Sequence, residues 1–136
     1  MKLVAGPSTI VGTGCFAVVG FKKGDIVGEY TGERIGDEEA DSRYEGQEMT
    51  YLFYVNDGEY IDALHDSNPV KYINHSCDPN CESEQDDDRI FIRALRDITA
   101  GEELTYDYRY IVDENDEDEY TCVCGTKNCR KTMRAP

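Results

Sequence analysis

Four cysteines have the residue type and the spacing of a structural metal site. Three of them, Cys122, Cys124 and Cys129, lie close together near the end of the chain. A tetrahedral zinc site needs four ligands, so one more must come from elsewhere in the sequence. Cys77 is the obvious donor, because it lies in a polar segment at residues 74–81. The spacing therefore predicts one zinc ion, bound by four thiolates, that fastens the tail to the body of the domain.

Disulfides are the alternative to zinc, because six cysteines in a short chain can pair. The stretch at residues 1–7 breaks off before an apolar signal region forms, so we expect no secretion. In an intracellular, reducing compartment the thiols stay reduced, and clustered reduced thiols favour metal. That compartment would be the nucleus in a eukaryote and the cytoplasm otherwise. Cys15 and Cys81 are left over, and we expect them to be small buried side chains rather than ligands.

The composition describes one acidic domain. A chain of 136 residues can bury one hydrophobic core, and its 29 acidic and 14 basic residues give a formal net charge of −15. No stretch approaches the length of a membrane span. A surface with this charge should repel nucleic acid and attract basic peptides. The acidic runs at residues 82–88 and 113–119 are either solvated loops or, for the second run, the flank of a groove for a Lys- or Arg-rich segment.

Short strands dominate the expected secondary structure. One helix is predicted at residues 37–44, with Asp37 as its N-cap and Gly46 after its end. A hairpin turn is predicted at Asn56-Asp57-Gly58. The expected strands cover residues 14–19, 26–35, 50–55, 60–63, 89–95 and 104–110, and a short helix is expected at 67–73. The predicted fold class is therefore mainly β, with several small sheets.

Two tyrosines near the end of this strand pattern could also take part in chemistry. Tyr106 and Tyr108 are two residues apart, so on a strand their phenols point into the same space. Taken alone, this spacing is typical of ordinary strand residues, with the ring in the core and the hydroxyl at the edge.

Together these segments resemble the SET-domain family of protein lysine methyltransferases, with the zinc-binding post-SET module attached. The resemblance covers nearly the whole chain in the right order. The Gly-x-Gly element alone is a weak signal, whereas the Asn-His-Ser-Cys loop together with the two-tyrosine strand and the cysteine cluster is highly specific. The matching segments are Gly12-Thr13-Gly14, Tyr51-Leu52-Phe53, Ile61-Asp62-Ala63, Tyr72 through Cys81, residues 101–108, and the three tail cysteines with Arg130.

The resemblance implies a SET-domain fold of several small β-sheets with a C-terminal pseudoknot and a zinc-bound post-SET tail. The pseudoknot brings the loop of Asn74 against the segment of Tyr108. The implied boundaries are residues 1–111 for the SET domain, 112–119 for an acidic linker and 120–136 for the post-SET zinc-binding module. S-adenosylmethionine is the implied methyl donor, bound on one face, and the target lysine enters a narrow channel from the other.

The resemblance also implies how the cofactor is bound. Gly12 and Gly14 would let the backbone pass close to it, where a Cβ would collide. The side chain of Asn74 would bind its amino-acid end and the backbone of His75 its adenine, while Lys71 is a candidate partner for its carboxylate. The complete implied set of cofactor-binding residues is Gly12, Thr13, Gly14, Tyr51, Lys71, Asn74, His75 and Tyr108.

Tyr108 corresponds to the catalytic tyrosine of the family, which positions the lysine amine for an in-line displacement. Tyr106 lies where the family uses Phe or Tyr to set the number of methyl groups added. A tyrosine at this position favours mono- or dimethylation.

The implied substrate is a lysine in a basic protein, such as a histone tail or a ribosomal protein. It would add as a strand between residues 44–50 and the segment after Tyr108. No direct binding of nucleic acid or membrane is expected. The alternatives are a catalytically silent SET-like module that binds basic peptides, and a small zinc-stabilised interaction domain without a cofactor.

Overall fold

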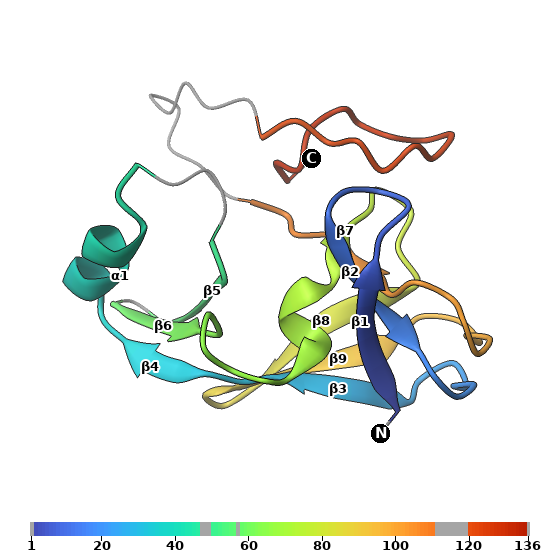
Figure 1. Cartoon of the computed structure of the whole chain (residues 1–136), viewed down its shortest axis with the longest axis horizontal. Helices are drawn as coiled ribbons and strands as arrows, with labels where there is room; N and C mark the ends of the chain where they lie inside the picture. Colours follow the sequence, from blue (N-terminus) through green and yellow to red (C-terminus); the bar gives the residue numbers. More distant parts are fainter. Residues whose placement is uncertain (1, 47–49, 57, 111–119, 136) are drawn as a thin grey trace.

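Small sheets and one short α-helix make up the described part of the chain (Figure 1). The computed structural model describes residues 2–46, 50–56, 58–110 and 120–135. Within these residues the strands form two two-stranded and two three-stranded sheets. The prediction of a mainly β fold with several small sheets is therefore confirmed.

Strand β9 (Arg89–Ala94) is the centre of one three-stranded sheet, between β3 (Ile26–Tyr30) and β8 (Cys81–Asp86). Both neighbours run antiparallel to it. Alternate side chains of β9, among them Ile90 and Ile92, point into the core and are fully buried. This alternation is the pattern that predicted a strand here.

The acidic run at residues 82–88 differs from the loop that the sequence predicts. Most of it belongs to β8, which pairs with β9 along its whole length, and the chain then turns at Asp87 with a positive φ of 56°. Every residue of β8 after Cys81 is exposed, so the run is solvated but extended. Charged side chains suit an edge strand, because they discourage pairing with a second chain.

Strand β1 (Leu3–Pro7) pairs antiparallel with β2 (Thr13–Ala17). The sequence predicts β2, but it does not predict β1, because Gly6 and Pro7 are residue types that are depleted in strands. The connection between the two strands is a tight loop in which Gly12 has a positive φ of 53°.

The second three-stranded sheet has the order β4 (Glu33–Ile35), β6 (Glu59–Asp62), β5 (Leu52–Asn56). Strands β5 and β6 form the predicted antiparallel hairpin, although Asp57 in its turn lies outside the described residues. The single strand predicted at residues 26–35 is divided into β3 and β4 at Gly32. A Cβ at Gly32 would lie 2.3 Å from the carbonyl oxygen of Asp62, so the chain changes sheet where two backbones cross closely.

Helix α1 (Asp37–Tyr44) has the predicted bounds, but its N-cap differs. The cap is Gly36, which has extended backbone and makes no side-chain capping bond, and Asp37 is the first helical residue. Acidic residues in the first turn still suit the positive end of the helix dipole. The short helix predicted at residues 67–73 is one 3-10 turn, η1 (Pro69–Tyr72), whose cap Asn68 accepts a hydrogen bond from the backbone of Val70. None of the described helices has both the length and the apolar character needed to cross a membrane.

Strands β7 (Asn74–His75) and β10 (Thr105–Tyr106) run parallel, so Asn74 is paired with Thr105 and His75 with Tyr106. This pairing brings the Asn74 loop against the tyrosine segment, as the resemblance implies. Strand β10 is much shorter than the strand predicted at residues 104–110. It ends because the next backbone N–H groups turn to side chains: Tyr108 N–H donates to His75 Nδ1 and Arg109 N–H to Asp107 Oδ1.

A continuous hydrophobic core lies between these sheets. Its largest fully buried side chains include Ile61, Ile73 and Leu104. Cys15 and Cys81 are fully buried in the same core, which confirms the prediction that they are small buried side chains.

Candidate functional site

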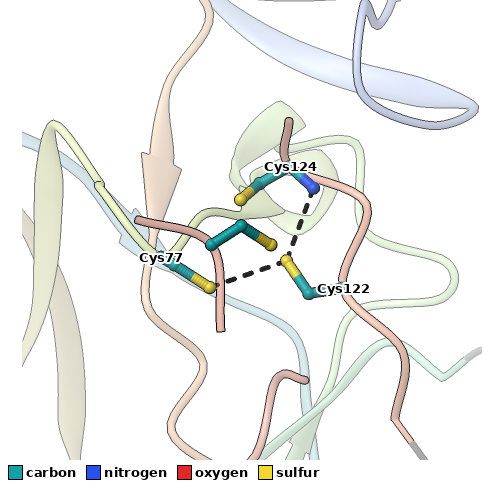
Figure 2. A group of neighbouring side chains, drawn as sticks. Cys77, Cys122 and Cys124 are labelled. Atoms are coloured by element: carbon teal, nitrogen blue, oxygen red, sulfur yellow. Dashed lines mark hydrogen bonds between the residues drawn. The ribbon is translucent and has the colours of Figure 1, made fainter. Parts of the chain in front are cut away.

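The four cysteines predicted as metal ligands lie together. The sulfur atoms of Cys77, Cys122, Cys124 and Cys129 are all within 4.8 Å of one another, and those of Cys77 and Cys122 are 3.7 Å apart (Figure 2). Tetrahedral zinc with Zn–S bonds of about 2.3 Å holds its sulfurs about 3.8 Å apart. Because all four donors are soft thiols in this arrangement, the cluster fits zinc.

Hydrogen bonds around these sulfurs also suit thiolates. The backbone N–H of Arg130 lies 3.3 Å from Cys77 Sγ, and that of Cys124 lies 3.4 Å from Cys122 Sγ. The N–H of Lys131 lies 3.4 Å from the sulfur of Cys129. Donors aimed at sulfur stabilise the negative charge that metal binding needs. All six cysteines are free thiols, so the alternative of a disulfide framework is not what the structure contains.

A bidentate ion pair also joins the tail to the body of the domain. The guanidinium of Arg130 donates to both carboxylate oxygens of Asp107, at 2.9 and 3.0 Å. Burial is the largest single influence and by itself would raise the pKa of Asp107, but the hydrogen bonds and charge of Arg130, together with the backbone N–H of Arg109, lower that pKa below its usual value. The tail backbone also pairs with Tyr110, which bonds to Met133 and Ala135. No local pattern in the sequence singles out Asp107, because its partner Arg130 lies 23 residues further along the chain.

His75 connects the tyrosine segment to the metal cluster. Its Nδ1 accepts the backbone N–H of Tyr108 at 3.0 Å, and its Nε2 lies 3.4 Å from Cys77 Sγ. Burial of the ring lowers the pKa of His75, so the imidazole is neutral near pH 7. Since Nδ1 accepts, the single ring hydrogen is on Nε2 and faces the thiol. The sequence analysis assigned a role to the backbone of His75 and missed this role of the ring.

The two predicted phenols lie side by side. The ring centroids of Tyr106 and Tyr108 are 4.9 Å apart, and further aromatic rings continue on both sides at Phe53 and Tyr110. The hydroxyl of Tyr108 donates to the carbonyl oxygen of Ile73 at 2.5 Å. Burial raises the pKa of both Tyr106 and Tyr108 above the usual value, so both phenols are protonated at neutral pH.

The Gly12-Thr13-Gly14 element lies beside Asn74. The side-chain amide of Asn74 donates to the carbonyl oxygens of Val11 and Thr13, at 3.1 and 3.3 Å. A Cβ at Gly12 would meet nothing within 4 Å, and that residue needs a positive φ. A Cβ at Gly14 would instead meet the chain itself, because Glu103 Oε2 lies 2.6 Å from its position. The sequence therefore places these residues together correctly, but it misses Glu103.

Lys71 and Tyr51, two further residues expected to bind the cofactor, lie beside each other. The ammonium of Lys71 donates to the carbonyl oxygens of Leu64 and Asp66, at 3.0 and 2.8 Å. It also lies 5.4 and 5.1 Å from the ring centroids of Tyr51 and Tyr72. The ammonium is thus already bound to the backbone, and its expected role toward a cofactor carboxylate stays a prediction.

Two sets of earlier expectations fall outside the described residues. The acidic linker at residues 112–119 lies there, and so does part of the expected peptide groove, at residues 47–49. The domain boundaries and the path of a substrate peptide therefore stay predictions.

Most of the chain matches known proteins. The family described as "SET domain" matches residues 12–109. The chain is 41% identical over 129 residues to "Histone-lysine N-methyltransferase, H3 lysine-4 specific" of Mycosarcoma maydis, covering 88% of this chain and 9% of that protein. It is 42% identical over 134 residues to "Histone-lysine N-methyltransferase 2D" of Homo sapiens, covering 93% of this chain and 2% of that protein. For "Histone-lysine N-methyltransferase, H3 lysine-4 specific" of Saccharomyces cerevisiae the identity is 39% over 132 residues, covering 90% of this chain and 12% of that protein. The chain thus spans only a small part of each of these relatives.

Proposed function

Because this chain belongs to the SET-domain family of protein lysine methyltransferases, we propose that it transfers a methyl group from S-adenosylmethionine to a lysine side chain of a histone tail. One observation carries the proposal. The parallel pairing of β7 with β10 brings Asn74, the Gly12-Thr13-Gly14 element beside it and Tyr108 into one place, next to a cluster of four cysteines of which three belong to the tail. The names of the relatives make lysine 4 of histone H3 the first substrate to test.

The reaction needs alignment and loss of a proton more than it needs a strong base. Bound S-adenosylmethionine supplies a methyl group on a positively charged sulfur. A free lysine, with a pKa of about 10.4, is neutral in only about one molecule in a few thousand at pH 7. A wall of buried aromatic rings disfavours the ammonium form and so raises the neutral fraction. Tyr106 and Tyr108 supply part of that wall.

Tyr108 acts as a positioning acceptor rather than as a general base. Its phenol is protonated, and its hydrogen is given to the carbonyl oxygen of Ile73. The hydroxyl oxygen therefore keeps lone pairs that can accept an N–H of the incoming amine. Tyr106, whose side chain is almost fully buried, limits the space around that amine, so we propose mono- or dimethylation as the product.

The same arrangement supports the assignment of bound groups. Cys77, Cys122, Cys124 and Cys129 would hold one structural zinc ion. The donor set and its spacing support this. The cofactor would be held by Gly12, Thr13, Gly14, Tyr51, Lys71, Asn74, His75 and Tyr108. A histone substrate places the activity in the nucleus, and the acidic surface favours a basic tail over nucleic acid as the partner.

The test is transfer of radiolabelled methyl groups to core histones and to histone H3 peptides with and without lysine 4. We expect label on one lysine, and Tyr108→Phe should lower turnover about 100-fold or more while binding of S-adenosylhomocysteine is kept. Tyr106→Phe should raise the final methylation state, as measured by mass spectrometry. Retained turnover in Tyr108→Phe would contradict the role of this tyrosine.

Two outcomes would favour the alternatives. Cofactor binding without transfer to any basic protein would indicate a catalytically silent SET-like module. Absence of cofactor binding, with zinc present, would indicate an interaction domain.

A further inference from the structure

Glu103 occupies a position that none of the assigned roles explains. Its carboxylate accepts hydrogen bonds from the hydroxyl of Ser8, at 2.7 Å, and from the side-chain amide of Asn74, at 3.1 Å. The backbone N–H of Thr9 also lies 3.3 Å from its second oxygen. Among the described residues no basic side chain forms an ion pair with Glu103. The carboxylate of Glu103 therefore accepts hydrogen bonds only from neutral donors, which are Ser8 and Thr9 in the loop between β1 and β2, and Asn74.

The surroundings of Asn74 fix the orientation of its amide. Its nitrogen faces the carbonyl oxygens of Val11 and Thr13 and the carboxylate of Glu103, none of which can donate a hydrogen. Only the NH₂ group can face three such acceptors. The carbonyl oxygen of Asn74 must point the other way, and no described residue donates a hydrogen bond to it.

Glu103 also ties the loop to this amide. The hydroxyl of Ser8, which donates to Glu103, accepts the backbone N–H groups of Ile10 and Val11 at 2.9 and 3.3 Å. The close approach of the carboxylate depends on Gly14, because a Cβ there would lie 2.6 Å from Glu103 Oε2. One carboxylate thus organises both the loop and the amide that face the expected amino-acid end of the cofactor.

We propose that Glu103 is a positioning residue for the amino-acid end of the cofactor. It holds the Asn74 amide so that the carbonyl oxygen points outward and accepts a hydrogen from the cofactor's ammonium group, and its negative charge favours that cation. An ammonium has three donors and no acceptor, so an outward amide oxygen suits it and an outward NH₂ does not. This inference rests on the proposed function, because it names the part of the cofactor that the site recognises.

The test compares two ligands that differ only in the group concerned. S-adenosylhomocysteine carries the amino-acid end, whereas 5′-methylthioadenosine has the same adenosine and thioether without it. The measurement is titration calorimetry on the zinc-loaded chain. Glu103→Gln should lower the affinity for S-adenosylhomocysteine about tenfold or more and should change the affinity for 5′-methylthioadenosine by less than about twofold. Glutamine keeps the shape of the side chain but removes its negative charge and leaves it only one acceptor oxygen.

A neighbouring glutamate provides the matched control. Glu102 bonds to Arg96 and to the backbone of Thr99, outside this network, so Glu102→Gln should change neither affinity. Ser8→Ala removes one hydrogen-bond donor to the Glu103 carboxylate. It should lower the affinity for S-adenosylhomocysteine by a few fold and leave the affinity for 5′-methylthioadenosine unchanged. This second variant keeps the test decisive if Glu103→Gln does not fold.

An equal loss of affinity for both ligands in Glu103→Gln would overturn the inference, because Glu103 would then only stabilise the loop. Unchanged binding of both ligands would overturn it as well. In either case the proposed function stands if the unmodified chain binds S-adenosylhomocysteine. Failure of the unmodified chain to bind S-adenosylhomocysteine would instead contradict both this inference and the proposed function.

Discussion

The body of the domain and its C-terminal tail are held by different kinds of interaction. The body has paired strands and a continuous core whose largest side chains, such as Ile61 and Ile92, are fully buried. In the described tail, residues 120–135, only Cys122 is buried. Figure 1 draws no strand arrow in this segment. Its sheet pairing consists of isolated bridges such as Thr121 with Thr132.

This difference shows which interactions complete the site. A segment of this length cannot bury enough apolar surface to offset the conformational entropy of ordering it. The tail therefore depends on the cysteine cluster, on the ion pair between Arg130 and Asp107, and on the backbone bonds to Tyr110. Since Asp107 lies between Tyr106 and Tyr108, the order of the tail and the geometry of the candidate active site are linked. We expect the central strand β9 to stay folded when the tail is released.

Removal of the proposed zinc ion should have the largest effect and should act mainly on the tail. Structural zinc contributes on the order of 10 kcal/mol in small metal-dependent modules, far more than any single contact of the tail. We expect a chelator to abolish methyl transfer and to speed hydrogen exchange in residues 120–135, while strands β8 and β9 keep their protection. Mass spectrometry of exchanged peptides, with zinc content measured in parallel, checks this.

Two cysteine variants separate the metal site from the core. Cys129→Ser should lose zinc and methyl transfer with little change in the melting temperature of the body. Cys81→Ala, at a fully buried core position, should keep one equivalent of zinc and lower the melting temperature. Loss of zinc from Cys81→Ala, or collapse of the body in Cys129→Ser, would show that the two regions are not independent.

A cavity in the body should give the converse result, with a smaller free-energy change. Ile92 is fully buried in the central strand β9, so Ile92→Ala should lower the free energy of unfolding by about 3 kcal/mol. Ile26, which is 44% exposed, is the matched control, and Ile26→Ala should be close to neutral. Thermal unfolding and zinc content are the measurements, and a loss of zinc in Ile92→Ala would contradict the comparison.

The ion pair between tail and body should give the smallest of these effects. Its two side chains are 24% and 18% exposed, so the coupling between Arg130→Gln and Asp107→Asn in a double-mutant cycle should be about 1 kcal/mol. We expect methyl transfer to fall a few fold with zinc retained. The pair of Arg89 with Glu29 on the body surface is the control, and breaking it should leave methyl transfer unchanged. Equal effects of the two pairs would argue against a link between tail order and the active site.

The parts of the fold that sequence predicts well are those set by local pattern. Helix α1, the β5–β6 hairpin and strand β9 follow from periodicity and turn residues close to them in the chain. The errors come where tertiary contacts override that pattern. The strand predicted at residues 26–35 is broken by the close approach at Gly32, and the strand predicted at 104–110 ends where His75 and Asp107 take over its backbone donors.

The sequence by itself determined the chemical types available at the site. The sequence contains four soft thiols, two phenols two residues apart and an Asn-His pair. The order of these motifs along the chain identifies the family. These features are local, because they depend on residue identity and short spacing.

The tertiary structure alone decided which of these groups meet and what orients them. Ser8 and Glu103 are 95 residues apart in the chain, and Cys77 and Arg130 are 53 apart, yet each pair is in contact. The first contact accompanies the bridge between Phe16 and Glu103, and the second forms where the tail folds against the loop of Cys77; no spacing in the sequence specifies either. The roles of Glu103, Asp107 and the ring of His75 emerge only there, because a hydrogen bond depends on a distance of about 3 Å that a linear pattern does not contain.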